Sequence, residues 1–586
     1  MTRGRALALV LSVALVGAAV GTSALVVSRS QASATPMSEV RSAVRVGRTA
    51  PGERITFDFV LRIPRRAAFD AYARDVDTPG SPHYRQFLSA PEIGVRFGLS
   101  DAALARLDTG LARHHLEVVE RYPERTALRV AGSARSVESA LGVVLDDYRD
   151  TTSRARFHRP RHAPRLPRWL ATAVRGVSGL DSQPPALVGL ADRTRAAVPV
   201  SAPAAGTIEV PPDALTPTLL ARAFDIEPLR AAGIDGSGQS VAILAISDFD
   251  DADLPLWDQA TGTTGAPPVR HVRVGTGSLS EDELEAALDV EVVRAVAPQA
   301  RISLFSVSPG SPTFMADALR EVLRDGQATI VSASFSACDA ARSFEAQHWD
   351  RESSRAAVQA ARVAGLNMVF SSGDNGAYIC RHKYALDDLA ATVAFPADTG
   401  FVTAVGGTSL ARAADGTYVE EAGWEDPLSL GGGGGGVSPT EPRPAWQRGP
   451  GVANEQSDGH RQIPDVAAPG DPWGGYFIVW NDAGTRQGGV CAGTSAATPF
   501  WGGLLALFQQ MSANAGIPRL GFVNPMLYAI AASDAPNTVF HDVVRGGNLL
   551  YDAAPGWDYS TGLGTPIAAA LGNAMVDYLR EHGPST

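Results

Sequence analysis

Cysteine and lysine are scarce in this chain of 586 residues. The three cysteines, Cys338, Cys380 and Cys491, exclude a disulfide-dense scaffold and a four-cysteine zinc site, and they allow at most one disulfide. Lys383 is the only lysine among 51 basic residues, which indicates a composition bias and not a function. Because 45% of the residues are hydrophobic and 19% are charged, a disordered chain is excluded, and the length suggests about three folding units.

Long apolar runs are also missing, except at the N-terminus. Arg3 and Arg5 precede an uncharged run from Ala6 to Val27, and Ala32-Ser33-Ala34 fits a small-residue cleavage site. This pattern predicts a signal peptide over residues 1–34 and a secreted, extracellular protein. The run of roughly 20 residues could also span a bilayer, so the chain would be held at a membrane only if the segment is not cleaved.

The charge is distributed unevenly along the chain. Residues 1–212 carry a net charge of +10 and residues 213–586 carry −21, which together give −11. The opposite signs predict that the two parts attract each other. The acidic second part argues against nucleic acid as a partner.

Composition divides the chain after the signal into three segments. Residues 43–182 mix strand-like runs with helical ones, which is typical of a small α+β domain. Residues 183–212 are rich in Pro, Ala and Ser and are predicted to form an exposed, cleavable linker. In residues 213–586, apolar runs of strand length such as Ser240–Ile246 alternate with helical stretches. This alternation predicts a parallel sheet covered on both faces.

Ser495 lies in the string Gly493-Thr494-Ser495-Ala496-Ala497-Thr498-Pro499. Small residues at the start of a helix expose the hydroxyl, and the helix N-terminus favours an anionic intermediate there. The alternative is an ordinary serine in a helix cap. A serine nucleophile needs a base, and subtilisin-like enzymes take it from a His-Gly-Thr string. After residue 212 only His582 precedes a glycine, and its place near the C-terminus makes it a poor candidate.

Carboxylates are the remaining candidates for the base. Glu285 and Asp289 are four residues apart in a helical, largely apolar stretch, which predicts a buried pair on one helix face that shares a proton. An acidic helix start would explain Glu281–Glu283 but not Asp289. Asp374 follows the apolar strand Asn367–Phe370, at a carboxyl end where α/β sites form, although a turn aspartate is the simpler interpretation.

Together these motifs resemble the sedolisin family of serine-carboxyl peptidases. Glu285-x-x-x-Asp289, Ser372-Gly373-Asp374-x-Gly376 and the Ser495 string occur in the family's order, and residues 43–182 resemble its activation pro-domain, of the pro-kumamolisin type. Further stretches are similar to the family: Gly80–Ser89, Thr216–Ile226, Arg461–Tyr476 and Gly556–Pro566.

The resemblance implies an α/β catalytic domain with a subtilisin-like, doubly wound, mainly parallel sheet, preceded by a smaller α+β, ferredoxin-like pro-domain. Ser495 would be the nucleophile, Glu285 the general base and acid, Asp289 its support, and Asp374 a protonated oxyanion donor. A carboxylate base and a neutral carboxylic acid coexist at low pH, or at higher pH if burial raises the donor's pKa.

The function expected from the resemblance is a secreted acid endopeptidase, made as a zymogen. Its partners would be protein or peptide substrates and its own pro-domain, which acts as an intramolecular inhibitor. A tripeptidyl-peptidase of the same family is one alternative, and it would need a cleft closed behind the third subsite. A catalytically inactive binding scaffold is another, and the complete set of four catalytic residues argues against it.

Two loops near the C-terminus suggest a metal site. Oxygen ligands from tight turns suit Ca²⁺, and the resemblance implies one structural Ca²⁺. The ligands would be the side chains of Asp542 and Asp558 and the carbonyls of Val543, Ala554 and Gly556. The family often has glycine at the position of Ala554, but only the carbonyl is needed there.

Three features stay open at the level of sequence. The stretch Ser334–Cys338 lacks a glycine that many relatives carry, which leaves the wall of the substrate cleft undefined. The run Gly431–Gly436 fits a flexible surface loop or a loop beside the substrate. Cys338 and Cys380 follow successive strands and could pair, whereas Cys491 is expected to be a small buried residue.

Overall fold

The computed structural model describes residues 43–151, 154–183, 186–188, 194–199, 208–311, 313–338, 344–381, 389–533 and 538–583. The predicted signal segment, residues 1–34, lies outside these ranges. Within them, no helix is both long and apolar enough to cross a membrane. From Val40 onward the chain forms one compact unit.

The activation domain, residues 43–182, is built on a four-stranded antiparallel sheet. Its strands, in spatial order, are β3 (Leu116–Arg121), β4 (Ala127–Ser133), β2 (Arg54–Leu61) and β7 (Val174–Ser178). In β2, Ile55, Phe57, Phe59 and Leu61 enter the domain's own core with α3 (Asp101–Arg113) and α4 (Ala134–Leu141). Since side chains alternate across a strand, Asp58 points to the other face of the sheet.

Other parts of the activation domain extend this arrangement. A second antiparallel sheet contains β1 (Ala43–Arg48), β5 (Leu145–Asp150) and β6 (Arg156–Pro160). The apolar faces of α1 (Arg66–Asp75) and α2 (Ala90–Phe97) do not join the activation-domain core. Phe69 and Phe97 instead belong to a core cluster of the catalytic domain. A short helix, α5 (Arg168–Ala171), precedes β7.

The catalytic domain is built on a mainly parallel sheet, as the sequence predicts. In spatial order its strands are β11 (Arg270–Val274), β12 (Arg301–Val307), β10 (Ser240–Ala245), β13 (Ile330–Ala333), β15 (Asn367–Ser371), β16 (Thr403–Arg412) and β17 (Tyr418–Gly423). The first six are parallel, β17 is antiparallel, and β22 (Val466–Pro469) pairs in parallel with β16.

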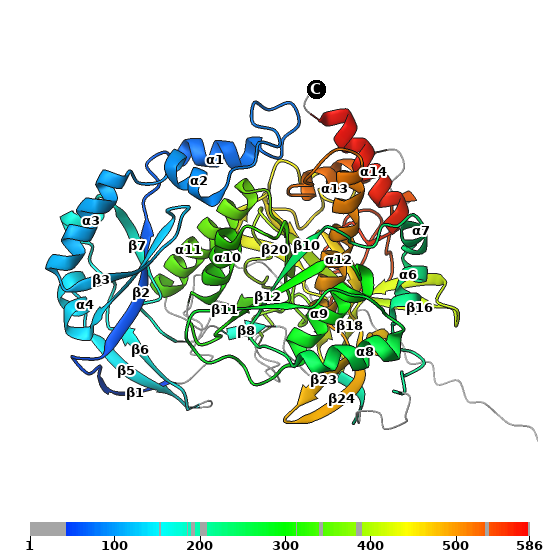
Figure 1. The fold of residues 1–586 in the computed structure, drawn as a ribbon, viewed down its shortest axis with the longest axis horizontal. Coiled ribbons are helices and arrows are strands. Elements are labelled where there is room, and N and C mark those ends of the chain that lie inside the picture. Colours follow the sequence, from blue (N-terminus) through cyan, green and yellow to red (C-terminus); the bar gives the residue numbers. More distant parts are fainter. Residues whose placement is uncertain are drawn as a thin grey trace, which may run out of the picture. The chain divides into compact units, whose positions relative to one another are not determined.

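Helices cover both faces of this sheet (Figure 1). Val241, Ile243 and Ala245 of β10 pack in one core cluster with α9 (Leu284–Val296) and α12 (Thr494–Asn514). Ala242 and Leu244 pack in another, with α10 (Phe314–Asp325) and α11 (Phe344–Val363). Because both faces are covered, the central strands β10, β13 and β15 are buried along their whole length.

Parts of the predicted linker form strands with the catalytic domain. β8 (Ala186–Val188) pairs antiparallel with β14 (Ser336–Cys338). β9 (Thr194–Pro199) pairs antiparallel with β24 (Thr485–Cys491), which also pairs with β23 (Tyr476–Asp482). The linker is therefore not only a spacer between domains, because it adds strands to two edges of the catalytic domain.

The described residues of the catalytic domain form further helices, strands and 3₁₀ turns. They are α6 (Pro217–Ala223), α7 (Glu227–Ala231), α8 (Leu254–Thr261), α13 (Asn524–Ala531), α14 (Ala568–His582), the strands β18 (Glu425–Asp426), β19 (Gly431–Gly432), β20 (Gly436–Pro442), β21 (His460–Ile463), β25 (Phe540–His541) and β26 (Thr565–Pro566), and the 3₁₀ turns η1 (Asp251–Asp253) and η3 (Pro472–Gly474).

Candidate active site

Ser495 lies where the chain turns from β24 into α12. Gly493 has a φ of +97°, a conformation that glycine adopts without strain, and α12 begins at the next residue. Ser495 is fully buried, and its Oγ donates to the carbonyl of Ser334, at 3.0 Å. The predicted placement of Ser495 at the start of a helix is confirmed, but the expectation of an exposed hydroxyl is wrong, because the surrounding elements bury the residue completely.

Glu285 and Asp289 lie on α9, which packs against α12. Both are buried, with exposed fractions of 8% and 0%, so the predicted buried helix is confirmed. The hydroxyl of Ser334, just after β13, donates to Asp289 Oδ1 and also lies 2.9 Å from the carbonyl oxygen of Ser495. Ser334 thereby connects the carboxylate helix to the residue predicted as nucleophile.

Asp374 follows β15 and is tied to the residue before Ser495. The backbone N–H of Thr494 donates to Asp374 Oδ1 at 2.8 Å, and the Thr494 hydroxyl donates to the same oxygen at 2.7 Å. The N–H of Gly373 donates to that hydroxyl at 3.1 Å. Asp374 is buried, and its carboxylate accepts both hydrogen bonds from the first residue of α12. It therefore does more than stabilise its own turn, which was the simpler interpretation.

The structure therefore connects Asp289, Asp374 and Ser495 through Ser334 and Thr494, near the carboxyl ends of β13 and β15 and the N-terminus of α12. Glu285 lies one helical turn before Asp289 on α9.

Sequence reasoning did not assign roles to Ser334 and Thr494. Both residues nevertheless belong to stretches that the sequence singles out. Thr494 is part of the Ser495 string, and Ser334 begins the stretch Ser334–Cys338 at the wall of the substrate cleft. The sequence did not reveal which residues they contact. Ser334 contacts Asp289, 45 residues away along the chain, and Thr494 contacts Asp374, 120 residues away.

The glycine run Gly431–Gly436 supports the Asp374 loop. The N–H of Gly432 donates to the Asp374 carbonyl at 3.0 Å, and that of Gly434 to the Gly373 carbonyl at 2.7 Å. A Cβ on Gly434 would lie 2.0 Å from the carbonyl oxygen of Ser372, so only glycine fits. Since Gly432–Gly436 is buried, the interpretation as a flexible surface loop is wrong.

The predicted Ca²⁺ ligands come from two adjacent turns. The N–H of Gly556 donates to both oxygens of Asp542 at 3.1 Å, and the N–H of Ala554 donates to Asp558 Oδ2 at 3.0 Å. Asp558 and Val543 are buried, and burial raises the pKa of both carboxyl groups, that of Asp558 to about 7. A cation would compensate such buried oxygens, so the residues fit the expected ion.

The search for metal-binding clusters among the described residues found no group of three or more His, Cys, Asp or Glu side chains. The proposed set has only two carboxylates and relies on carbonyls for the rest. Cys380 is disulfide-bonded, and Cys491 is buried, as predicted. The side chain of Cys338 lies outside the described residues, so its pairing with Cys380 stays a prediction.

Known proteins match both domains. The model of the pro-kumamolisin activation domain matches residues 41–183, and that of the subtilase family matches residues 276–524. Kumamolisin from Bacillus sp. (strain MN-32) is 30% identical over 557 residues, which cover 91% of this chain and 94% of kumamolisin. The chain belongs to the sedolisin family of serine-carboxyl peptidases.

Two further relatives place it within that family. Sedolisin from Pseudomonas sp. (strain 101) is 27% identical over 566 residues, covering 93% of this chain and 90% of sedolisin. Tripeptidyl-peptidase 1 from Bos taurus is 28% identical over 567 residues, covering 91% and 94%. The solved structure of Pseudomonas sedolisin, a serine-carboxyl proteinase complexed with two molecules of pseudo-iodotyrostatin, aligns with a TM-score of 0.54 and 27% identity over 63% of this chain and 99% of that chain.

The family membership fixes the broad function and fold. This sedolisin-family chain is a serine-type peptidase with a subtilisin-like catalytic fold. Its activation domain makes it a zymogen, with that domain as an intramolecular inhibitor and peptides as substrates.

Proposed function

We propose that the chain is a secreted endopeptidase that acts at acid pH with Ser495 as nucleophile and Glu285 as general base. The observation that carries this proposal is the connection of both catalytic elements through Ser334, which contacts Asp289 on α9 and the backbone of Ser495 on α12. Secretion rests on the N-terminal segment, residues 1–34.

The proposed reaction begins when Ser495 Oγ attacks the carbonyl carbon of the scissile peptide bond. Glu285 accepts the hydroxyl proton and returns it to the leaving amine. Water then attacks the acyl-enzyme while Glu285 takes its proton. The ester bond to Ser495 Oγ breaks, and Glu285 returns the proton to Oγ as the carboxylic acid product leaves. Asp289, one turn further along the helix and held by the Ser334 hydroxyl, orients Glu285, as the third member of a catalytic triad orients the base.

Asp374 is proposed to donate a hydrogen bond to the oxyanion that forms on the scissile carbonyl. Both Thr494 donors bind Oδ1, so the donated proton belongs on Oδ2. A carboxyl group can donate only when it is protonated, which is why the proposed activity needs acid. Removal of one oxyanion donor typically costs about 10²–10³ in turnover.

Endopeptidase action is favoured by the course of the linker. β8 pairs with β14, which begins two residues after Ser334, and β9 pairs with β24, which ends four residues before Ser495. The linker thus adds extended chain to two strands that adjoin Ser334 and Ser495 along the sequence, which supports a cleft that is open on both sides of the nucleophile. A tripeptidyl-peptidase needs the cleft closed on one side.

The test is digestion of a peptide library and of N-terminally blocked proteins by the processed enzyme at pH about 4, near the carboxylate pKa range, followed by mass spectrometry. Internal cleavage of the blocked proteins is expected, with products of many lengths. Release of tripeptides alone, and only from free N-termini, would instead identify a tripeptidyl-peptidase. Ser495→Ala protein is the control for contaminating activity.

We also propose one structural Ca²⁺ bound by Asp542, Asp558 and the carbonyls of Val543, Ala554 and Gly556. Two observations support the ion: all five ligands are oxygens, and both carboxylates accept hydrogen bonds from the same turn, Ala554–Gly556. The ion would fix these turns and take no part in catalysis.

A further inference from the structure

A cavity of about 660 Å³ lies where helix α1 of the activation domain packs against the catalytic domain. Its activation-domain wall is formed by residues of α1 and of the turn that follows, residues 77–79. Its catalytic-domain wall is formed by residues of α11, of the segment 441–448, and of α13 and α14. The volume is in the range of sites that bind small molecules, roughly 300–1,000 Å³. No residue that lines the cavity belongs to the candidate active site, so the proposed peptidase function does not account for it.

The cavity carries an excess of positive charge. Six arginines line it, against three carboxylates. Each carboxylate is already bound by one arginine, and the pairs are Arg66–Asp70, Arg355–Glu441 and Arg362–Asp77. Three arginines therefore remain to attract an anion.

The three remaining arginines are Arg74, Arg443 and Arg448, and within the described part of the chain none of them forms an ion pair. Arg74 lies in the last turn of α1, while Arg443 and Arg448 follow β20. The Nη1 atom of Arg443 is shielded from solvent and has no hydrogen-bond partner among the residues that the structure describes. Because a buried donor without a partner costs free energy, an anion that accepts from this nitrogen would be stabilised in the cavity.

Most of the uncharged lining is apolar. Phe401 and Trp446 contribute aromatic rings, and Pro442, Pro444 and Pro525 contribute rigid apolar surface. Guanidinium groups beside apolar walls suit a molecule that has both an acidic group and an apolar body. Inorganic phosphate or sulfate would satisfy the arginines but would leave the apolar surface in contact with water.

Both walls of the cavity are held in place by contacts that need no ligand. Phe69 and Tyr72 of α1 belong to a core cluster of the catalytic domain. In the opposite wall, the side-chain amide of Gln447 donates to the carbonyl of Gln462 at 2.6 Å and to the hydroxyl of Tyr528 at 3.1 Å. These hydrogen bonds fix the segment 441–448 against the body of the catalytic domain.

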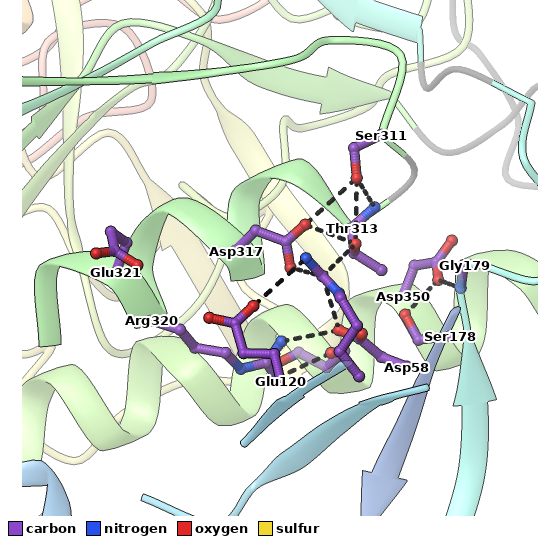
Figure 2. Close-up of polar contacts among 12 residues, drawn as sticks. Asp58, Glu120, Ser178, Gly179, Ser311, Thr313, Asp317, Arg320, Glu321 and Asp350 are labelled. Carbon is purple, nitrogen blue, oxygen red and sulfur yellow. Dashed lines mark hydrogen bonds and ion pairs between the residues drawn. The ribbon is translucent and has the colours of Figure 1, made fainter. Parts of the chain in front are cut away.

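Ion pairs elsewhere fix the orientation of the activation domain. Asp58 of β2 lies 3.4 Å from a guanidinium nitrogen of Arg320 on α10, and Arg129 of β4 pairs with Asp317 on the same helix. Figure 2 shows Asp58, Asp317 and Arg320 gathered between the two domains. The cavity is therefore a preformed feature of the chain, and a ligand does not have to order either wall.

We infer that this cavity is a binding site for an amphipathic anion, meaning a carboxylate, sulfonate or phosphate ester with an aromatic or branched aliphatic body. Arg443, Arg448 and Arg74 bind the acidic group, and the apolar body lies against Phe401 and Trp446. Because α1 supplies one wall, the ligand binds only while the activation domain is docked. By linkage, such a ligand stabilises the docked arrangement.

The test uses the full-length Ser495→Ala chain at neutral pH, so that no self-digestion occurs and the outcome does not depend on the proposed reaction. The probe is 8-anilinonaphthalene-1-sulfonate, an amphipathic anion whose fluorescence rises in an apolar site, and binding is measured by fluorescence titration and by calorimetry. A single saturable site is expected. N-Phenyl-1-naphthylamine, which has the same rings but no charge, is the control for purely apolar binding. Absence of saturable binding of the sulfonate would overturn the inference.

Arg443→Gln and Arg448→Gln are each expected to lower the affinity for the sulfonate by about 10–100-fold, because each removes a charge-assisted hydrogen bond. The affinity for the neutral amine should not change. The matched control is Arg545→Gln, which removes an exposed arginine that pairs with Glu420 outside the cavity, and it should bind both probes like the parent. If the two cavity variants bind the sulfonate as the parent does, the inference is wrong.

Ala529→Trp tests the location of the site without a change in charge. Ala529 is exposed on α13 and lines the cavity, so a large side chain there fills space that the apolar body of the ligand needs. Saturable binding of both probes should be lost. Ala102→Trp, at an exposed position of α3, is the matched control and should bind like the parent. Unchanged binding by Ala529→Trp would place the probe elsewhere and contradict the inference.

Hydrogen exchange tests whether the activation domain forms part of the site. The sulfonate is expected to slow amide exchange both in α1 and in the segment 441–448 of the Ser495→Ala chain. The Arg443→Gln variant should show no such protection at the same probe concentration. Protection of the segment 441–448 alone would show that α1 does not close the site, and the inference would fail.

Discussion

Glu421 provides a test of how the catalytic domain is adapted to acid. It lies on β17 with its carboxyl group buried, 5% exposed. The hydroxyl of Thr408 donates to it at 2.6 Å, and the hydroxyl of Thr565 donates to its other oxygen. Burial outweighs these two hydrogen bonds and raises the pKa of Glu421 to about 7, from an ordinary value of 4.5.

The direction of the pH effect follows from these two pKa values. In the folded protein the group stays protonated up to a higher pH than in the unfolded chain. Its contribution to stability is therefore fully present below the unfolded value and is lost as pH rises through the folded value. A difference of roughly 2.5 pKa units corresponds to about 3 kcal/mol at most, at 1.36 kcal/mol per unit.

Glu421→Gln should remove this pH dependence, because the amide keeps the shape and never ionises. One threonine hydroxyl still donates to the amide oxygen, and the other rotates to accept from the amide nitrogen. We expect the variant to match the parent in melting temperature at pH 4 and to exceed it at pH 8.5, both in the Ser495→Ala background. Glu420→Gln is the control, since Glu420 is exposed and pairs only with Arg545. An equal difference between variant and parent at both pH values would refute the reasoning.

Four further predictions concern catalysis and maturation. Glu285→Gln should lower turnover by about 10²–10⁴-fold without a change in melting temperature; near-normal turnover of a folded variant would contradict its role as base. Ser334→Ala should lower kcat more than KM, because the bridge between α9 and α12 is lost, and an unchanged kcat would argue against it. Excess chelator should lower the melting temperature of the mature enzyme relative to excess Ca²⁺, and equal values would exclude the site. At pH about 4, wild-type protein should shorten to a fragment that begins near residues 184–213, whereas Ser495→Ala protein, held alone, should remain full length. Equally fast shortening of both would show that another protease does the work.

The sequence predicted those parts of the structure whose signals are local. The helix around Glu285 and Asp289 is apolar on most sides, so its burial could be inferred without a partner. The strand before Asp374 is a continuous apolar run between helical stretches, which is typical of a covered parallel sheet. The turn into Ser495 is encoded by small residues within one short string.

What the sequence did not predict depends on residues that are far apart along the chain. The run Gly431–Gly436 has the composition of a flexible loop. Only its close packing against the backbone of Ser372, Gly407 and Tyr559 explains why side chains are excluded there. The strands β8 and β9 lie in a segment rich in Pro, Ala and Ser, and they form because β14 and β24 offer unpaired edges. Strand formation depends more on such context than on intrinsic propensity.

The buried charges between the two domains are a second example. Asp58 interrupts an apolar strand, and alone it resembles an exposed position on a half-buried sheet. Only the structure shows that Asp58 is the partner of a buried arginine, Arg320, which lies 262 residues later in the chain. The net charges of +10 and −21 predict that the two parts attract, but they contain no information about which residues meet.

These local contacts also bear on how acid acts during maturation. Loss of negative charge from the acidic catalytic domain weakens its long-range attraction for the basic activation domain. The buried interface responds in the opposite sense, because burial raises the pKa of Asp317 and Glu124 although Arg129 and Arg320 lie beside them. Groups whose pKa is higher in the complex than in water take up protons more readily there, so acid favours the complex through them. If Asp374 donates to the oxyanion as proposed, acid would activate the catalytic site while the activation domain is still docked, and we expect cleavage of the linker to precede release of that domain.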